Sequence, residues 1–457
     1  MSARVLLYPL VMAVMVAQEM RPPAAPQPRP PADGGAATGA GSTAIADLLA
    51  SSRGVAPALC ALAADGVNSW GEGAMAPALP LAAEVRARVR ALHQRTITAE
   101  EGRVLIASLG APDGCERHLA AMLLGRSEDD ALAAQVARRL NAEGAPERAA
   151  VLLALGLMEG KAQAGAIERT LRDSSADVRA NAAWALGRLD ARSSAPAVEN
   201  ALGDREAMVR GAAAAALGHL ESRKSAPALG RRLAEDDAPE VRRVAAWALG
   251  QLNDRGSSGP LTTALKSDRD AGVREMAAWA LAECEAKGAA DRLSMALRAD
   301  ESAGVRETAA WALGQLEGRA GEGALTEALN DPDRRVRATA AWALGSIGLE
   351  RAPAALVKAM QDDDQDVRLR AAWAISQIGD ESAMPAVAKA LRAERDAHVR
   401  KAQIRALMES GQVPDDTLRG LAESDDSDMR QLAVQALAGR MSPWPWPWPE
   451  PRPRPFP

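Results

Sequence analysis

Hydrophobic and polar positions recur along this chain in units of 31 or 32 residues. Each unit contains a Val-Arg pair, and its Arg serves here as the reference position from which offsets are counted. The reference residues are Arg179, Arg210, Arg242, Arg274, Arg306, Arg337, Arg368 and Arg400, with weaker copies at Arg117, Arg148 and Arg430. A fixed period of this length predicts repeated supersecondary units that must stack, because one unit alone cannot bury its apolar face.

Each unit has the pattern of a short first helix and a longer second helix. The first helix often has a proline in its first turn, where no backbone N–H is needed: Pro196, Pro227, Pro260, Pro353 and Pro385. The second helix is predicted to begin after a capping residue at offset -4: Ser175, Asp270, Ser302, Asp333, Asp364, Asp396 and Asp426. It is predicted to end near the glycine at offset +8.

The second helix has a narrow apolar stripe. Offsets -1, +3, +7 and +10 fall on one face at about 100° per residue, as in Val241, Ala245, Leu249 and Leu252. Cys284 occupies offset +10 of its unit, so we expect a small buried hydrophobic residue there. The predicted fold class is therefore all-α, an α-solenoid of stacked helix pairs.

Tryptophan recurs at offset +5, on the side of the second helix opposite the apolar stripe. The row consists of Trp184, Trp247, Trp279, Trp311, Trp342 and Trp373. Two interpretations stay open: the indoles form a partly exposed binding surface, or they fill the grooves between units as a packing spine. The binding hypothesis adds the charged neighbours at offset +1, which are Arg243, Glu275 and Glu307.

A carboxylate stands at offset -6 in the same units. The series is Asp173, Asp204, Asp236, Asp268, Asp300, Asp331 and Asp362, followed by Glu394. We predict a structural ladder in which each reference Arg forks onto carboxylates or helix-end groups of an adjacent unit. The alternative is an acidic stripe that binds a ligand.

The repeated motif D-x-x-V-R-x-x-A-A-x-A-L-G-x-L resembles the short HEAT repeats of the phycobilisome-lyase type, over about residues 115–440. The resemblance implies a right-handed solenoid whose second helices line the concave surface. It says little about function, because such repeats serve mainly as binding scaffolds.

The two ends of the chain differ in composition from the repeats. Residues 1–18 are predicted to be a signal peptide, since Arg4 precedes an apolar stretch too short to span a bilayer. We expect a Pro/Gly/Ala-rich linker at 19–43, a helical region with degenerate repeats at 44–114, the solenoid at 115–441 and a polyproline-II tail at 442–457. Export would place the protein in the periplasm or outside the cell; without a signal it would be cytoplasmic. Cys60 and Cys115 are either a disulfide pair or two buried thiols.

Charge and motifs narrow the function. The net charge of -5 argues against broad binding to nucleic acid or to anionic membranes. No HExxH or G-x-S-x-G motif occurs, so no catalytic residue, metal site or cofactor is predicted. We expect a noncatalytic scaffold for a protein or peptide, the chain's own Pro/Trp tail being one candidate ligand. The alternatives are a bilin-lyase-like chromophore-binding enzyme and an accessory of an envelope sensor metallopeptidase.

Overall fold

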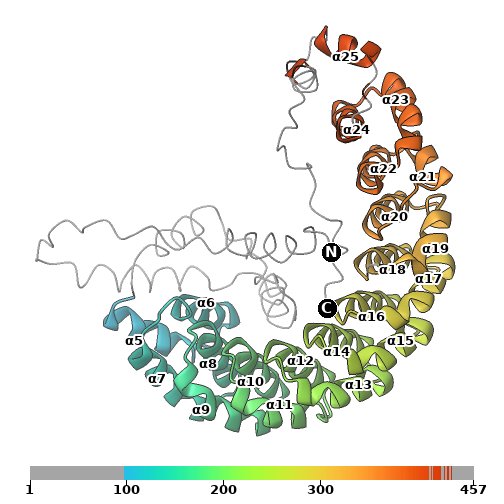
Figure 1. The fold of residues 1–457 in the computed structure, drawn as a ribbon. Helices are drawn as coiled ribbons and strands as arrows, with labels where there is room; N and C mark the ends of the chain where they lie inside the picture. The colour runs from blue at the N-terminus through green and yellow to red at the C-terminus, as the bar shows by residue number, and fades with distance from the viewer. Residues whose placement is uncertain are drawn as a thin grey trace, which may run out of the picture. The chain divides into compact units, whose positions relative to one another are not determined.

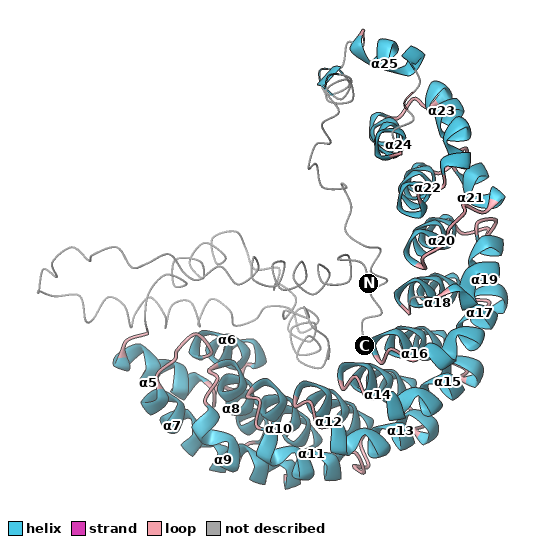
Figure 2. Ribbon diagram, viewed as in Figure 1, coloured by secondary structure: helices cyan, strands magenta, loops and turns pink. Residues whose placement is uncertain are grey.

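The computed structural model describes residues 97–316, 318–410, 413, 415–423, 427, 430, 431 and 434. Within these residues the backbone forms helices and short turns, and no strand occurs (Figure 2). The predicted signal peptide, the linker, the Pro/Trp tail, Cys60 and Asp426 lie outside the described residues. The disulfide between Cys60 and Cys115 therefore stays a prediction.

The helices alternate between two rows of one stack (Figure 1). First helices form the outer row: α5 (Ala99–Ser108), α7 (Asp130–Arg138), α9 (Ala164–Arg169), α11 (Ala195–Ala201), α13 (Ala226–Glu235), α15 (Ser258–Ser267), α17 (Ala290–Ala299), α19 (Glu322–Ala328), α21 (Ala354–Ala359), α23 (Met384–Ala393) and α25 (Asp415–Ala422). Second helices form the inner row: α6 (Gly114–Leu124), α8 (Ala145–Leu157), α10 (Ala176–Arg188), α12 (Ala207–His219), α14 (Pro239–Gln251), α16 (Ala271–Glu283), α18 (Ala303–Gln315), α20 (Arg334–Ser346), α22 (Gln365–Ile378) and α24 (Ala397–Glu409). The predicted α-solenoid is confirmed.

Short 3-10 turns lie beside many of the outer helices. They are η1 (Arg139–Asn141), η2 (Lys161–Gln163), η3 (Thr170–Arg172), η4 (Arg192–Ser194), η5 (Arg223–Ser225), η6 (Arg255–Ser257), η7 (Lys287–Ala289), η8 (Arg319–Gly321) and η9 (Glu381–Ala383). The helix pair α5–α6 packs on α7 and α8. The stack thus extends upstream of residue 115 into the region where degenerate repeats were expected.

The predicted capping residues stand directly before the inner helices. Asp270 accepts a hydrogen bond from the Val273 amide at 3.0 Å, and Asp396 accepts one from the His398 amide at 2.9 Å. Ser175 occupies the same position without a side-chain hydrogen bond. The inner helices therefore begin where the offset -4 residues predicted, because these residues leave helical geometry and satisfy free amides of the first turn.

The apolar stripe of the inner helices forms the core between the rows. Val241 is 2% exposed, Leu252 is 1% exposed, and Ala245 and Leu249 are fully buried. Cys284 is also fully buried, and burial raises the pKa of its thiol to about 11. The prediction that Cys284 acts as a small hydrophobic residue agrees with this position, since a thiol so buried stays protonated and unreactive at neutral pH.

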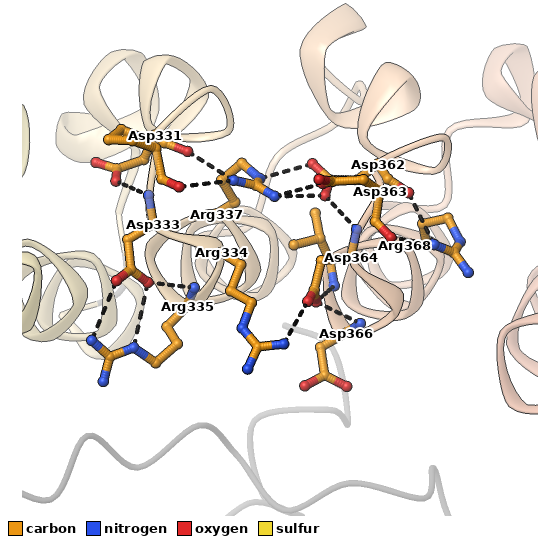
Figure 3. A network of polar contacts seen from close by, with 12 residues as sticks. Asp331, Asp333, Arg334, Arg335, Arg337, Asp362, Asp363, Asp364, Asp366 and Arg368 are labelled. Carbon is orange, nitrogen blue, oxygen red and sulfur yellow. Dashed lines mark hydrogen bonds and ion pairs between the residues drawn. The ribbon is translucent and has the colours of Figure 1, made fainter.

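The Arg–carboxylate ladder joins each unit to the next. Arg274 donates from Nε and Nη2 to the Asp300 carboxylate at 2.7 and 2.8 Å, and from Nη1 to the Asp268 carbonyl at 3.0 Å. Figure 3 shows the equivalent contacts of Arg337. The same fork recurs in Arg148–Asp173, Arg179–Asp204, Arg210–Asp236, Arg242–Asp268, Arg306–Asp331, Arg337–Asp362 and Arg368–Glu394. The carboxylate that would continue the series from Arg400 lies outside the described residues.

Each ladder carboxylate also holds its own loop. Asp300 accepts a hydrogen bond from the Ser302 amide at 2.9 Å, and Asp204 accepts one from the Glu206 amide at 2.9 Å. One carboxylate therefore fixes both the start of its own inner helix and the guanidinium of the preceding unit. This arrangement favours the structural interpretation of the ladder over an acidic stripe with free carboxylates.

Acid should destabilise the stack through this ladder. Hydrogen bonds from Arg179 lower the pKa of Asp204 below its usual value, and Arg148 does the same to Asp173. The pKa of these carboxylates is lower in the folded state than in the unfolded chain, where it is about 3.9. The stabilisation by the ion pairs is therefore fully present above that value and is lost as pH falls through the folded-state pKa values. Urea unfolding followed by circular dichroism should give similar midpoints between about pH 5 and 7 and a steep fall below about pH 4. An unchanged midpoint at about pH 3 would contradict this prediction.

Candidate functional site

The six predicted indoles lie along the inner row at different depths. Trp247, Trp311 and Trp342 are buried, with exposed fractions of 4%, 5% and 8%. Trp184, Trp279 and Trp373 are half-buried, and the rings of Trp342 and Trp373 stack nearly parallel with centroids 6.5 Å apart. Their burial favours the packing interpretation, while the half-buried members still present part of their rings at the surface.

Glycines in the preceding inner helices make room for these indoles. A Cβ added at Gly218 would lie 2.8 Å from Cζ3 of Trp247, and one at Gly250 would lie 2.6 Å from Cζ3 of Trp279. The same relation holds for Gly156 with Trp184, Gly314 with Trp342 and Gly345 with Trp373. The sequence interpretation treated these glycines only as markers of the helix end. The signal in the sequence is that a glycine at offset +8 is usually followed by a tryptophan at offset +5 of the next unit. This holds for five of the six tryptophans.

A group of polar residues gathers on the inner row between α14 and α22, and we call it the inner polar patch. The patch contains the predicted residues Arg243, Glu275, Glu307 and Trp311, together with Thr308, Arg335 and Arg370, which the sequence reasoning had not selected. Arg335 lies 3.7 Å from Glu307, and the charges of Glu275 and Arg370 also act on the pKa of Glu307. The structure therefore brings the predicted charged residues of offset +1 together into one patch.

Glycines in the following inner helix leave room for the long side chains of the patch. The Glu275 carboxylate lies over Gly304, where an added Cβ would be 2.8 Å from Oε2. Arg243 lies over Gly272, where an added Cβ would be 3.5 Å from Cδ of Arg243. Glycine at offset -2 therefore lets a long side chain at offset +1 of the preceding unit lie flat on the inner row.

The two glutamates of the patch are only loosely paired. Burial raises the pKa of Glu275 and of Glu307, and Arg335 lowers it again only in part. The nearest guanidinium nitrogen of Arg335 is 3.7 Å from Glu307, while the same side chain is 3.3 Å from Asp333. Thr308 also helps to lower the pKa of Glu275, although its hydroxyl makes no well-formed hydrogen bond. These carboxylates lose hydration without gaining a full set of donors.

Several donors of the patch have no partner among the described residues. They are Nε of Arg243, Nε1 of Trp311, and Nε and Nη1 of Arg370. Burial also lowers the pKa of Arg370. A buried polar group without a hydrogen bond costs about 1–3 kcal/mol. These donor atoms are themselves buried, so the cost falls on the packing of the inner row.

A cavity of about 550 Å³ lies away from the inner row, between α9 and α11, and its lining includes Glu168, Arg172 and Asp204. No group of three His, Cys, Asp or Glu residues within the described chain has the arrangement of a metal site. None of its helices combines the length and the apolar character needed to cross a membrane.

Comparisons with known proteins identify the repeat. A family model described as HEAT repeats matches residues 164–250, 226–314, 290–375 and 353–438. The structure is similar to importin β, with a TM-score of 0.57 and 13% identity over 96% of this chain and 65% of importin β. It is also similar to Kap95p, in a solved structure that concerns the binding of Kap95p to RanGDP. The TM-score is 0.54, with 15% identity over 87% of this chain and 66% of the solved chain. The chain thus spans about two thirds of these solved structures, and no curated protein matches it.

Proposed function

The chain belongs to the HEAT-repeat family, and on this premise we propose that it is a noncatalytic scaffold that binds a protein or an extended peptide segment on the inner row. The likeness to importin β and Kap95p concerns the fold alone. It supports the proposal because Kap95p, a solenoid of the same kind, binds another protein, RanGDP.

The observation that carries the proposal is the inner polar patch itself, in which Arg243, Glu275 and Glu307 are half-buried and Arg335 is exposed. Arg335 lies 3.7 Å from Glu307, and burial raises the pKa of both Glu275 and Glu307. The patch therefore offers guanidinium donors and carboxylate acceptors side by side. An extended peptide presents carbonyl and N–H groups alternately along its length, so it can satisfy both kinds of group at once.

The experiment is a peptide-array binding assay with matched variants. Wild-type protein should bind a subset of the arrayed peptides, and the double variant Arg243→Ala/Arg370→Ala should lose most of that binding. The control is Arg231→Ala, an exposed arginine of the outer helix α13, which should bind as wild type does. Equal loss in the control would place the interaction elsewhere and contradict the proposal.

The two alternative functions give different outcomes. A protein of the phycobilisome-lyase type that binds bilin would carry visible absorbance after purification with the pigment, and bound pigment would overturn the peptide scaffold in favour of the chromophore-binding enzyme. An accessory of an envelope metallopeptidase would bind a segment of that peptidase, which requires export. Export and docking of the Pro/Trp tail both depend on residues outside the described ranges and remain proposals.

A further inference from the structure

We propose that the groove between the outer helices α9 and α11 is a second interaction surface, which binds an acidic segment of a partner protein through Arg169 and Arg172. The inference goes beyond the proposed function, because it concerns the outer row and not the inner polar patch. The two surfaces share none of the residues named for them, so either one can fail its test while the other stands.

The groove lies where two consecutive outer helices are short. α9 has six residues and α11 has seven, whereas α13, α15 and α17 have ten each. Beyond α9 the backbone tightens into the 3-10 turn η3. α13 packs directly on α15, but α9 and α11 meet mainly through the turns η3 and η4. Short helices cover less of one another, and this leaves the cavity of about 550 Å³ between them.

The groove combines apolar side chains with a basic side. Leu171 and Ala201 are 8% and 9% exposed, and Ala197 is half-buried. Arg169 and Arg172 line the same cavity and are exposed. They stand three residues apart, which brings their side chains to one face of a helical turn. Small side chains on α11 therefore leave room for a ligand next to two guanidinium groups.

The carboxylates that line the groove already have partners. Asp204 accepts hydrogen bonds from Nε and Nη2 of Arg179 at 2.7 and 2.9 Å. Glu168 accepts one from the Ser194 hydroxyl at 2.6 Å. The ion pair neutralises Asp204, whereas Glu168 keeps its charge because its partner is neutral. Only the charge of Glu168 therefore opposes the basic side of the groove.

The donors of the groove, in contrast, are free. Within the described residues, the side chains of Arg169, Arg172 and Asn200 make no hydrogen bond or ion pair, and all three are exposed. Two free guanidinium groups outweigh the single charge of Glu168, so the groove attracts an anion. A guanidinium binds a carboxylate through two parallel hydrogen bonds, and the amide of Asn200 adds a donor.

The other features of the groove favour an acidic side chain over a nucleic acid. The hydrocarbon stem of a bound Glu can lie against Leu171 and Ala201 while its carboxylate reaches a guanidinium group. A nucleic acid needs many cations to neutralise successive phosphates, and the net charge of the chain, -5, opposes it. One or two carboxylates need only the local charge of the groove.

The experiment measures fluorescence anisotropy of the full chain with three labelled peptides that differ only in their central residues, which are Glu, Gln or Lys on an Ala/Leu background. The Glu peptide should bind most tightly. Arg169→Ala/Arg172→Ala should weaken its binding at least about tenfold, since charge-assisted hydrogen bonds are lost. The matched control Arg138→Ala/Arg231→Ala removes the same charge from exposed positions of α7 and α13 and should change binding less than about twofold. Ala197→Phe should also weaken binding, because its ring fills the groove without changing the charge.

Several results would overturn the inference. The Gln peptide could bind as tightly as the Glu peptide, or the control could weaken binding as much as Arg169→Ala/Arg172→Ala does, so that only net charge matters. Unchanged binding in Ala197→Phe would place the carboxylate outside the groove, and tighter binding of a single-stranded oligonucleotide would make a nucleic acid the ligand. An array peptide that depends on Arg243 and Arg370 should not displace the Glu peptide, and displacement would reduce the two surfaces to one. In each case selective binding on the peptide array leaves the proposed function standing.

Discussion

Replacing Trp247 with Ala should lower the free energy of unfolding by about 3–5 kcal/mol, the range for large aromatic residues truncated in a core. Trp247 is 4% exposed and fills the space that Gly218 leaves between α12 and α14. Urea unfolding followed by circular dichroism should show the loss. Because repeat stacks need not unfold in a single step, it should first affect the units that α14 joins.

Two further variants test whether this loss of stability comes from the packing of each indole against the glycine of the preceding inner helix. Trp184 is only half-buried, so Trp184→Ala should cost less than Trp247→Ala. Gly218→Ala should destabilise the wild type, because the new methyl would meet the indole, and should cost less in the Trp247→Ala background. If Trp247→Ala kept wild-type stability and lost peptide binding, the indoles would form a binding surface and not a packing spine.

Replacing Arg274 with Ala should cost about 3 kcal/mol, at the low end of the range for breaking a buried ion pair. The side chains of Arg274 and Asp300 are each 9% exposed, and removing the arginine leaves the Asp300 carboxylate without its two strongest donors. Arg274→Lys should lose part of the same energy, because an ammonium group cannot make the two parallel hydrogen bonds.

An exposed ion pair of similar length is the control for Arg274. Arg298 contacts Glu327 at 2.7 Å, but the two side chains are 43% and 61% exposed. Arg298→Ala should therefore change the free energy of unfolding by less than about 1 kcal/mol. Equal losses for Arg274→Ala and Arg298→Ala would show that the ladder contributes no more than ordinary surface charges.

The helix pairs, the caps and the ladder could be predicted because each depends on residues at fixed spacing in one unit. Asp270 and Asp396 mark helix starts by local geometry alone, and the period places every reference Arg beside a carboxylate of the neighbouring unit. The sequence left open which neighbour the Arg contacts. The structure shows that Arg274 reaches forward to Asp300 of the following unit and back to the carbonyl of Asp268.

The depth of the indoles could not be predicted from one helix at a time. A helical wheel places Trp247 opposite the apolar stripe, but its burial depends on how closely α12 and α14 approach, and Gly218 sets that distance. The same limit applies to the inner polar patch. The sequence did not indicate Arg335 or Arg370, because their importance comes from Glu307, which lies one inner helix away from Arg335 and two away from Arg370.

The most direct test of the binding surface is a crystal structure of the full chain with a peptide selected on the array for its dependence on Arg243 and Arg370. We predict an extended peptide along the inner row from α14 to α22, in contact with the inner polar patch. A peptide seated on the outer helices, with the inner polar patch unchanged, would contradict the account.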